Sequence, residues 1–171
     1  MFKNWRFDRT RALLLVGLLL PAAGFSAPKN VEAFVQPTWA QLAKPQAGPS
    51  AVVFTTTDCA FCPDVIDSLA KSIRPRGRAG ARLVVVVMDG AGKSRDLLRN
   101  AHYRKADRLF AFDGNELALR HAVNPEWRGL TPYVALVAPS GVVQFVTGPP
   151  SLQEVQALLD GRQDSPAKTT P

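Results

Sequence analysis

The chain has 171 residues, of which 46% are hydrophobic and 20% are charged, and its net charge is +7. This length suits one folded domain. The basic excess does not indicate a nucleic-acid surface, because the most basic stretch, Arg74 to Arg82, contains no interleaved aromatic residues. A solvated loop between a helix and a strand explains that stretch better, so we expect no nucleic-acid partner.

The first 27 residues have the organisation of a secretory signal peptide. Basic residues between Lys3 and Arg11 precede an apolar run, Ala12 to Leu20, and small residues follow up to Ala27. A membrane anchor would need about 17–25 apolar residues, roughly twice this run. The sequence therefore predicts a cleaved signal peptide (residues 1–27), a periplasmic location and no stable membrane anchor after cleavage.

Strand and helix patterns alternate between residues 38 and 159. Short apolar runs rich in β-branched residues predict strands, and apolar residues at helical spacing predict amphipathic helices. In chain order the predicted elements are a helix at Thr38–Ala43, a strand at Ala51–Thr55, a helix from Cys59 to about Arg74, a strand at Leu83–Met88, a helix near Ser94–Tyr103, a strand at Leu109–Phe112, a helix at Glu116–Ala122, strands at Tyr133–Ala138 and Val142–Thr147, and a helix from Ser151 to about Leu159. This order predicts an α/β fold with a mixed sheet and helices on both faces.

The two ends of the mature chain carry no such pattern. The segment before Thr38 is expected to be irregular. Residues 162–171 are polar and rich in Pro and Thr, so we expect a disordered tail there.

The only two cysteines, Cys59 and Cys62, lie where a predicted strand passes into a predicted helix. A helix start offers unpaired backbone N–H groups and the positive end of the helix dipole, and both stabilise a thiolate. Cys59 is therefore predicted to attack a partner disulfide, and Cys62 to resolve the mixed disulfide. Asp58 opposes part of this effect, because a carboxylate beside Cys59 disfavours its thiolate.

Two other uses of the cysteine pair remain open. A structural disulfide closing so short a loop would contribute only about 2 kcal/mol. A metal site would need His102 and His121 as further ligands, but their spacing from the cysteines matches no common zinc finger. We favour the redox interpretation and predict no metal and no cofactor.

With the cysteines placed, the sequence from about Thr38 to Leu159 resembles the thioredoxin-like superfamily. The strand before C-x-x-C, the helix that opens with it and Thr131-Pro132 before the hairpin carry this resemblance. In that superfamily a cis-proline at this place faces the disulfide. The resemblance implies a thioredoxin-like domain over residues 28–161, with four to five strands, and a substrate-binding surface formed by Thr131, Pro132 and Phe61.

Two subfamilies share these features. The segment from Leu109 to Gly114, with the helix after it, looks like the TlpA/ResA-like reductases. Ala60-Phe61 and Gly148-Pro149-Pro150 look more like the DsbC-type isomerases. The chain departs from thioredoxin itself at Asp58, which replaces a tryptophan, and at Val53, which replaces a buried aspartate.

A third motif, Gly90-Ala91-Gly92-Lys93-Ser94, stands between a predicted strand and a predicted helix, as a phosphate-binding loop does. That loop needs a glycine five residues before Gly92, where this chain has Val87. We therefore interpret the segment as a plain turn.

The residues together predict an exported thiol-disulfide oxidoreductase. Its partners would be protein thiols or disulfides and a redox partner protein. The alternative is a non-catalytic thioredoxin-like binding module, for example a Cu(I)-handling or partner-binding protein that uses the same two thiolates. Met1 and Met88 are the only methionines, which argues against a methionine-rich copper site.

Overall fold

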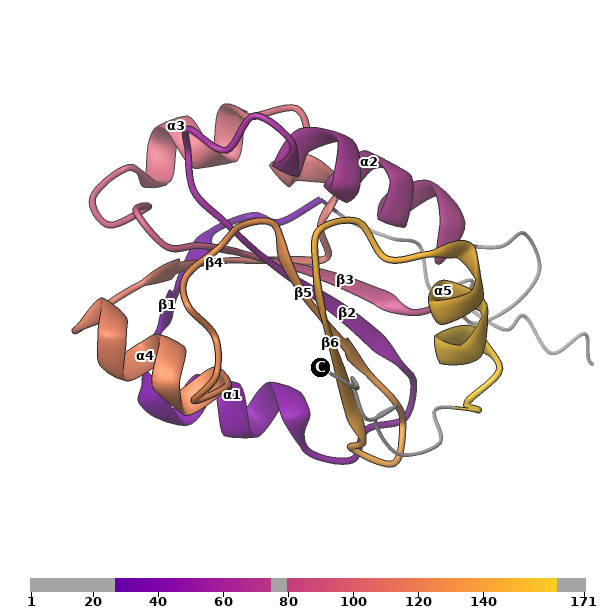
Figure 1. Cartoon of the computed structure of the whole chain (residues 1–171). Coiled ribbons are helices and arrows are strands. Elements are labelled where there is room, and N and C mark those ends of the chain that lie inside the picture. The colour runs from indigo at the N-terminus through magenta and orange to yellow at the C-terminus, as the bar shows by residue number, and fades with distance from the viewer. Residues whose placement is uncertain (1–26, 75–79, 163–171) are drawn as a thin grey trace, which may run out of the picture.

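The computed structural model describes residues 27–74 and 80–162, which form a six-stranded sheet with helices on both faces (Figure 1). The predicted signal peptide and tail fall almost wholly on residues 1–26 and 163–171, outside the described residues. The strands are β1 (Val31–Phe34), β2 (Ser50–Thr55), β3 (Arg82–Val87), β4 (Arg108–Phe112), β5 (Tyr133–Val137) and β6 (Val143–Thr147). The helices are α1 (Gln36–Ala43), α2 (Cys62–Ser72), α3 (Ser94–Arg99), α4 (Glu116–Val123) and α5 (Leu152–Leu159), with a 3-10 helix, η1, at Tyr103–Lys105.

The sheet is mixed, with the strand order β1-β4-β3-β2-β5-β6. The first four strands of this order run parallel to one another, whereas β5 is antiparallel to β2 and β6 is antiparallel to β5. All six residues of β2 are buried, and β3 is buried except for Arg82. Such continuous apolar strands are typical of the centre of a sheet that is covered on both faces.

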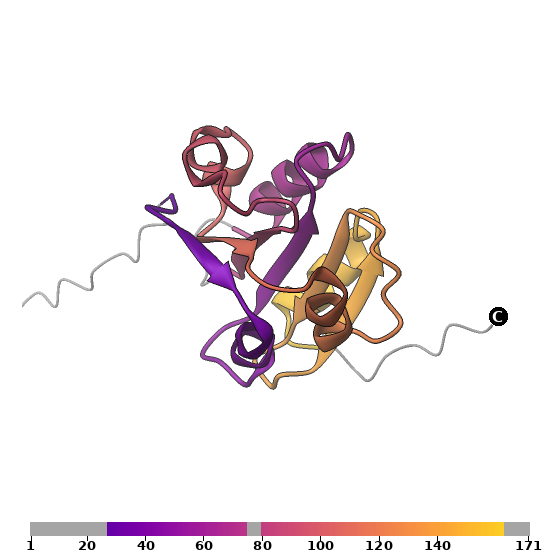
Figure 2. The same cartoon turned by 90° about the vertical axis from the view of Figure 1, so that its left-hand side faces the viewer.

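Helices cover both faces of the sheet (Figures 1 and 2), and a hydrophobic core lies on each face. Because side chains alternate along a strand, Val53 contributes to the core under α2, α3 and α5, and Phe54 contributes to the core over α1 and α4. The second core is rich in aromatic rings, with Phe34 and Phe54 in edge contact at 5.8 Å between centroids. The predicted α/β architecture with helices on both faces is confirmed.

The sheet has one strand more than the four to five that the sequence predicted. The additional strand is β1, in the segment expected to be irregular, and it pairs in parallel with β4 at the edge of the sheet. β1 has four residues, and only Phe34 among them is fully buried. So short a segment shows no periodicity of its own, and its pairing with β4 makes it a strand.

Two predicted helices differ from the structure by three or more residues at one end. α2 begins at Cys62 rather than Cys59, because Pro63 has no N–H to donate and is tolerated only in the first turn. The helix predicted near Ser94–Tyr103 ends at Arg99. The side chain of Asn100 accepts hydrogen bonds from the N–H groups of His102 and Tyr103, at 2.9 and 3.2 Å, and so starts a separate turn in place of the helix.

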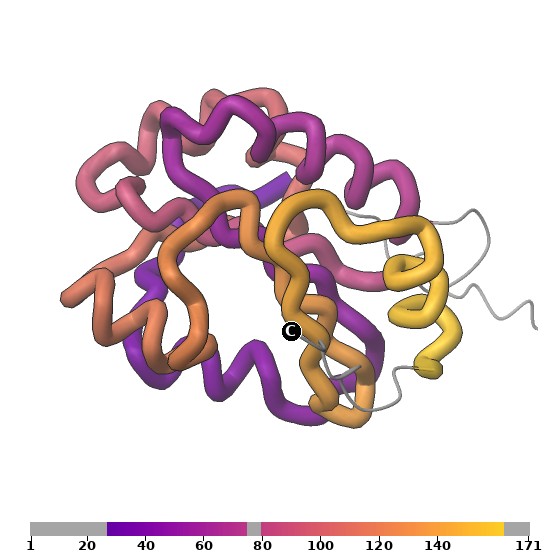
Figure 3. The backbone as a smooth tube through the Cα atoms, viewed as in Figure 1, coloured from indigo at the N-terminus to yellow at the C-terminus, as the bar shows by residue number. Residues whose placement is uncertain are grey.

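Four loops meet at one end of the strands, where β2 and β3 have their carboxyl ends. The register pairs Thr55 with Val87, Phe54 with Tyr133, and Tyr133 with Thr147. The loops after β2, β3 and β6 therefore lie beside the loop that enters β5, as the course of the backbone shows (Figure 3). Ligand sites of open α/β sheets lie at the carboxyl ends of the parallel strands, so a functional site is expected at this end of the sheet.

Candidate active site

Cys59 and Cys62 are joined by a disulfide in the loop between β2 and α2, with their Cα atoms 5.5 Å apart. Two successive turns build this loop. The Cys59 N–H donates to the Thr56 carbonyl at 3.3 Å, and the Cys62 N–H donates to the Cys59 carbonyl at 3.4 Å. The pair therefore lies at the carboxyl end of a central parallel strand.

The two sulfur-bearing residues differ in exposure. Cys62, the first residue of α2, is only 1% exposed, whereas Cys59, in the turn before the helix, is partly exposed. A reagent or a partner thiol can therefore approach Cys59 more readily than Cys62. The order of attack by the two sulfurs stays a prediction, and Cys59 stands three residues before the helix rather than at its first residue.

A pocket of about 620 Å³ is lined by Phe61, which stands between the two cysteines in the chain, and by Thr131 and Pro132. These are the three residues that were predicted to bind substrate. The Thr131–Pro132 peptide bond is cis, the isomer that the resemblance implied. Leu130 also lines the pocket. Phe61 is 74% exposed and Leu130 63% exposed, so this side of the disulfide presents apolar side chains to solvent.

Aromatic packing fixes the pocket wall that carries Leu130 and Pro132. The Trp127 indole stacks on the Tyr133 ring at 4.6 Å between centroids, and its Nε1–H donates to the Leu130 carbonyl at 3.0 Å. The Tyr133 hydroxyl accepts a hydrogen bond from the Asn124 side chain at 2.7 Å. The loop before β5 is therefore held from both ends, by a ring stack and by side-chain hydrogen bonds.

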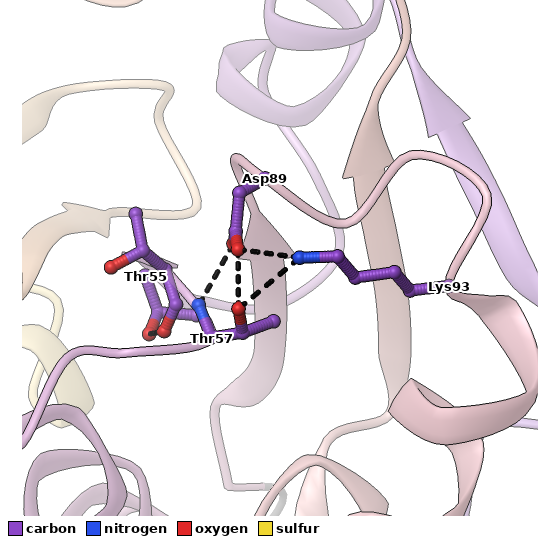
Figure 4. Close-up of polar contacts among 5 residues, drawn as sticks. Thr55, Thr57, Asp89 and Lys93 are labelled. Atoms are coloured by element: carbon purple, nitrogen blue, oxygen red, sulfur yellow. Dashed lines mark hydrogen bonds and ion pairs between the residues drawn. The ribbon is translucent and has the colours of Figure 1, made fainter.

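Thr57, Asp89 and Lys93 form a polar cluster (Figure 4). Asp89 and Lys93 follow β3, which lies on the side of β2 opposite to β5. The Thr57 N–H donates to Asp89 Oδ1 at 2.8 Å, and the Thr57 hydroxyl donates to Asp89 Oδ2. Lys93 Nζ lies 2.9 Å from Asp89 Oδ2 and 3.3 Å from Thr57 Oγ1. Partial burial raises the pKa of the Asp89 carboxyl, but the Thr57 hydrogen bonds and the Lys93 ammonium outweigh it and hold that pKa below its usual value.

The sequence patterns did not predict four residues at this end of the sheet: Leu130 and the three members of the polar cluster, Thr57, Asp89 and Lys93. The phosphate-loop-like motif that contains Lys93 predicts only a plain turn. Its i,i+4 spacing from Asp89 was the available signal, but the contact with Thr57 spans 36 residues. Such a contact depends on the pairing of β2 with β3, which local sequence patterns do not specify.

The two histidines of the metal interpretation lie apart. His102 precedes η1 and bonds Asp67 of α2 at 2.9 Å, whereas His121 belongs to α4, on the other face of the sheet. Among residues 27–74 and 80–162, no group of three or more His, Cys, Asp or Glu side chains is placed to hold a metal ion. No helix in these ranges is long and apolar enough to cross a membrane.

Known proteins resemble this chain in structure rather than in sequence. No family model and no curated protein matches it. The reduced N-terminal domain of PilB from N. meningitidis is similar with a TM-score of 0.52 and 19% identity, over 76% of this chain and 99% of that one. This likeness, together with the sheet topology, shows that the chain has a thioredoxin-like fold.

Two further solved structures show weaker likeness. One is a secreted disulfide oxidoreductase of Mycobacterium tuberculosis, homologous to E. coli DsbE, with a TM-score of 0.48 and 18% identity over 71% of this chain and 84% of that chain. The other is a thiol:disulfide interchange protein of the thioredoxin family from Chlorobium tepidum, with a TM-score of 0.48 and 16% identity over 81% and 97%.

Proposed function

We propose that this thioredoxin-fold protein exchanges disulfides with protein substrates through Cys59 and Cys62. The observation that carries the proposal is the placement of the disulfide, with Cys59 partly exposed and Cys62 buried at the start of α2. A disulfide across so short a loop restrains the unfolded chain little, so stability is a weak reason for its presence. A difference in access between two neighbouring thiols suits an attacking and a resolving sulfur.

The exchange begins from the disulfide form. A client thiolate attacks Cys59 Sγ, a client–Cys59 bond forms, and the Cys59–Cys62 bond breaks to release a Cys62 thiolate. A second client thiolate then attacks the client sulfur of the mixed disulfide and releases Cys59. The client dithiol is oxidised by two electrons, the protein is reduced by two, and the two protons that the client thiols lose pass to the Cys59 and Cys62 thiolates. The reverse sequence reduces a client disulfide.

The pocket beside the disulfide supports contact with a protein chain rather than with a small thiol alone. Phe61 and Leu130 offer exposed apolar surface, and Thr131 and Pro132 lie at the start of β5. We assign these residues to client binding. A client segment with an apolar side chain near its cysteine would bury that side chain here while its sulfur reaches Cys59.

Insulin reduction tests the proposal. With dithiothreitol as the electron source, wild-type protein should accelerate insulin precipitation, and the Cys59→Ser and Cys62→Ser forms should stay at the dithiothreitol background. A wild-type rate equal to that background would contradict the proposal. Titration with a competing Cu(I) chelator separates the alternative, because retention of Cu(I) without insulin reduction would indicate a copper-binding module instead.

Export belongs to the same proposal, since disulfide exchange of this kind suits an oxidising compartment. It rests on the charged, apolar and small-residue order of residues 1–27. Mass spectrometry of the periplasmic fraction should find a mature N-terminus between Phe25 and Pro28. An intact N-terminus in the membrane fraction would contradict export by a cleaved signal.

A further inference from the structure

The Thr57–Asp89–Lys93 cluster is attached to the cysteine loop rather than to the hydrophobic cores. Asp89 accepts both the N–H and the hydroxyl of Thr57, and Thr57 lies inside the turn that the Cys59 N–H closes on the Thr56 carbonyl. Two residues span at most about 7 Å. The Asp89 carboxylate therefore lies within about 10 Å of the Cys59 backbone, which is roughly one Debye length at 0.1 M salt, and Lys93 Nζ lies 2.9 Å from that carboxylate.

The backbone after β3 is shaped to place these two charges together. Gly90 admits no side chain, because a Cβ there would come within 2.9 Å of Leu97 and 3.0 Å of Ala111. Gly92 has a φ of 73°, in the left-handed region that glycine adopts at no steric cost. The Lys93 N–H then donates to the Gly90 carbonyl at 3.0 Å, so the turn brings Lys93 back onto Asp89.

The charges around Cys59 are mainly negative. Asp58 adjoins it in the chain, Asp64 lies in the first turn of α2, and Asp89 lies in the loop after β3, whereas Lys93 is the only basic residue in segments 56–66 and 88–94. The loop before Pro132 adds Glu126 and Arg128, of opposite charge. Tyr103 of η1 is buried, and burial raises the pKa of its hydroxyl, so it stays neutral at pH 7.

We infer that Asp89 and Lys93 are positioning residues for Cys59: Asp89 anchors the loop through Thr57, and Lys93 offsets the carboxylate charge that the anchor brings beside the attacking sulfur. The inference rests on the proposed exchange function and deepens it. Asp89 alone would hold the loop at the expense of the thiolate. Paired with Lys93, it holds the loop while leaving the thiolate fraction nearly unchanged. The motif Gly90–Ser94, which resembles a phosphate loop, thus serves to place Lys93 beside Asp89 and not to bind phosphate.

The charge part of the inference is tested on reduced protein by the pH dependence of Cys59 alkylation at low salt. Lys93→Gln should raise the apparent pKa of the Cys59 thiol and lower its alkylation rate at pH 7 about twofold, because the carboxylate is then uncompensated. Asp89→Asn should change the rate about twofold in the opposite direction. Both differences should shrink in about 1 M salt.

Two matched variants keep this test specific. Lys93→Arg preserves the charge and should retain the wild-type titration. Glu116→Gln breaks another i,i+4 ion pair, to Arg120 on α4, which packs on the face of the sheet opposite to α2, and should also leave the Cys59 titration unchanged. The charge-compensating role is excluded if the Cys59 thiol has the same apparent pKa in Lys93→Gln and Asp89→Asn as in Glu116→Gln, or if both substitutions shift that pKa in the same direction.

The anchoring part is tested by amide hydrogen exchange. Asp89→Ala should increase exchange of the Thr57 amide at least about tenfold, whereas Lys93→Gln should leave it near the wild-type rate; equal exchange in all three proteins would overturn the anchor. Neither experiment needs a client. Shifted titrations without insulin reduction would therefore reject the proposed function alone, and insulin reduction with unmoved titrations would reject the inference alone.

Discussion

The two sides of the cysteine loop differ in chemistry. Toward β5, Phe61, Leu130 and Pro132 line an apolar pocket whose wall is held by stacked rings. Toward β3, Thr57 and the Asp89–Lys93 pair form a cluster of hydrogen bonds and opposite charges. The first side has an open pocket, with Asp64 as the one charged residue in its lining, and on the second side the charged pair is hydrogen-bonded to Thr57 of the loop.

This difference indicates a division of labour. Apolar surface gives affinity roughly in proportion to the area buried, but it discriminates little between protonation states. Charged neighbours act on the thiolate but contribute little binding energy at an exposed position. We therefore expect substitutions on the β5 side to change client affinity, and substitutions on the β3 side to change thiol reactivity.

The largest effect is expected at the cysteines, where the two sides meet. In reduced protein, iodoacetamide should label Cys59 at least about tenfold faster than Cys62, because Cys62 is buried in α2 and Cys59 is not. The Cys59 thiol should titrate below the free value of about 8.5. Peptide mapping after brief alkylation measures the ratio. Equal labelling, or faster labelling of Cys62, would show that Cys59 is not the more reactive thiol. The roles assigned to the pocket and to the polar cluster would then lose their basis.

An intermediate effect is expected from the apolar side. Leu130→Ala should lower kcat/KM for a protein client about five- to tenfold, because the complex would then bury about 50 Å² less apolar surface, and it should not move the Cys59 titration. Leu117→Ala is the matched control, since Leu117 is 66% exposed on α4, on the opposite face of the sheet. A decrease as large in Leu117→Ala as in Leu130→Ala would show that the pocket is not the client surface.

The smallest effect is expected on stability. Asp89 has a lowered pKa in the folded protein, so its contribution is present above the unfolded pKa of about 3.9 and is lost as the pH falls through the folded pKa. Asp89→Asn should cost less than about 1 kcal/mol at pH 7, because the pair is solvent-screened, and close to nothing at pH 2. Urea unfolding at the two pH values measures this; a cost that persists unchanged at pH 2 would contradict the ionic origin.

Sequence patterns predicted the apolar side far better than the polar side. Strand and helix periodicities located β2, α2 and β5, and the motif C-x-x-C with Thr131-Pro132 indicated which loops would meet. These signals are local, or were supplied by resemblance to a known fold. The sequence patterns did not predict Leu130 as a pocket residue, because one exposed leucine in a loop belongs to no periodic pattern.

The polar side and the edge strand needed tertiary information. Asp89 and Thr57 are 32 residues apart and meet only because β2 and β3 pair in register. β1 is a strand only because β4 offers it a partner. In both cases the physical cause is a backbone pairing between segments distant in the sequence, which local sequence patterns do not specify.

Trapping of mixed disulfides tests the exchange proposal most directly. The Cys62→Ser protein should accumulate client proteins bonded covalently to Cys59, since the resolving thiol is absent, and mass spectrometry should place apolar residues close to the trapped client cysteines. The Cys59→Ser protein should trap about as little as the double-serine form. Absence of any Cys59-linked client, or efficient trapping through Cys62 in the Cys59→Ser protein, would contradict the assignment of Cys59 as the sulfur that meets the client.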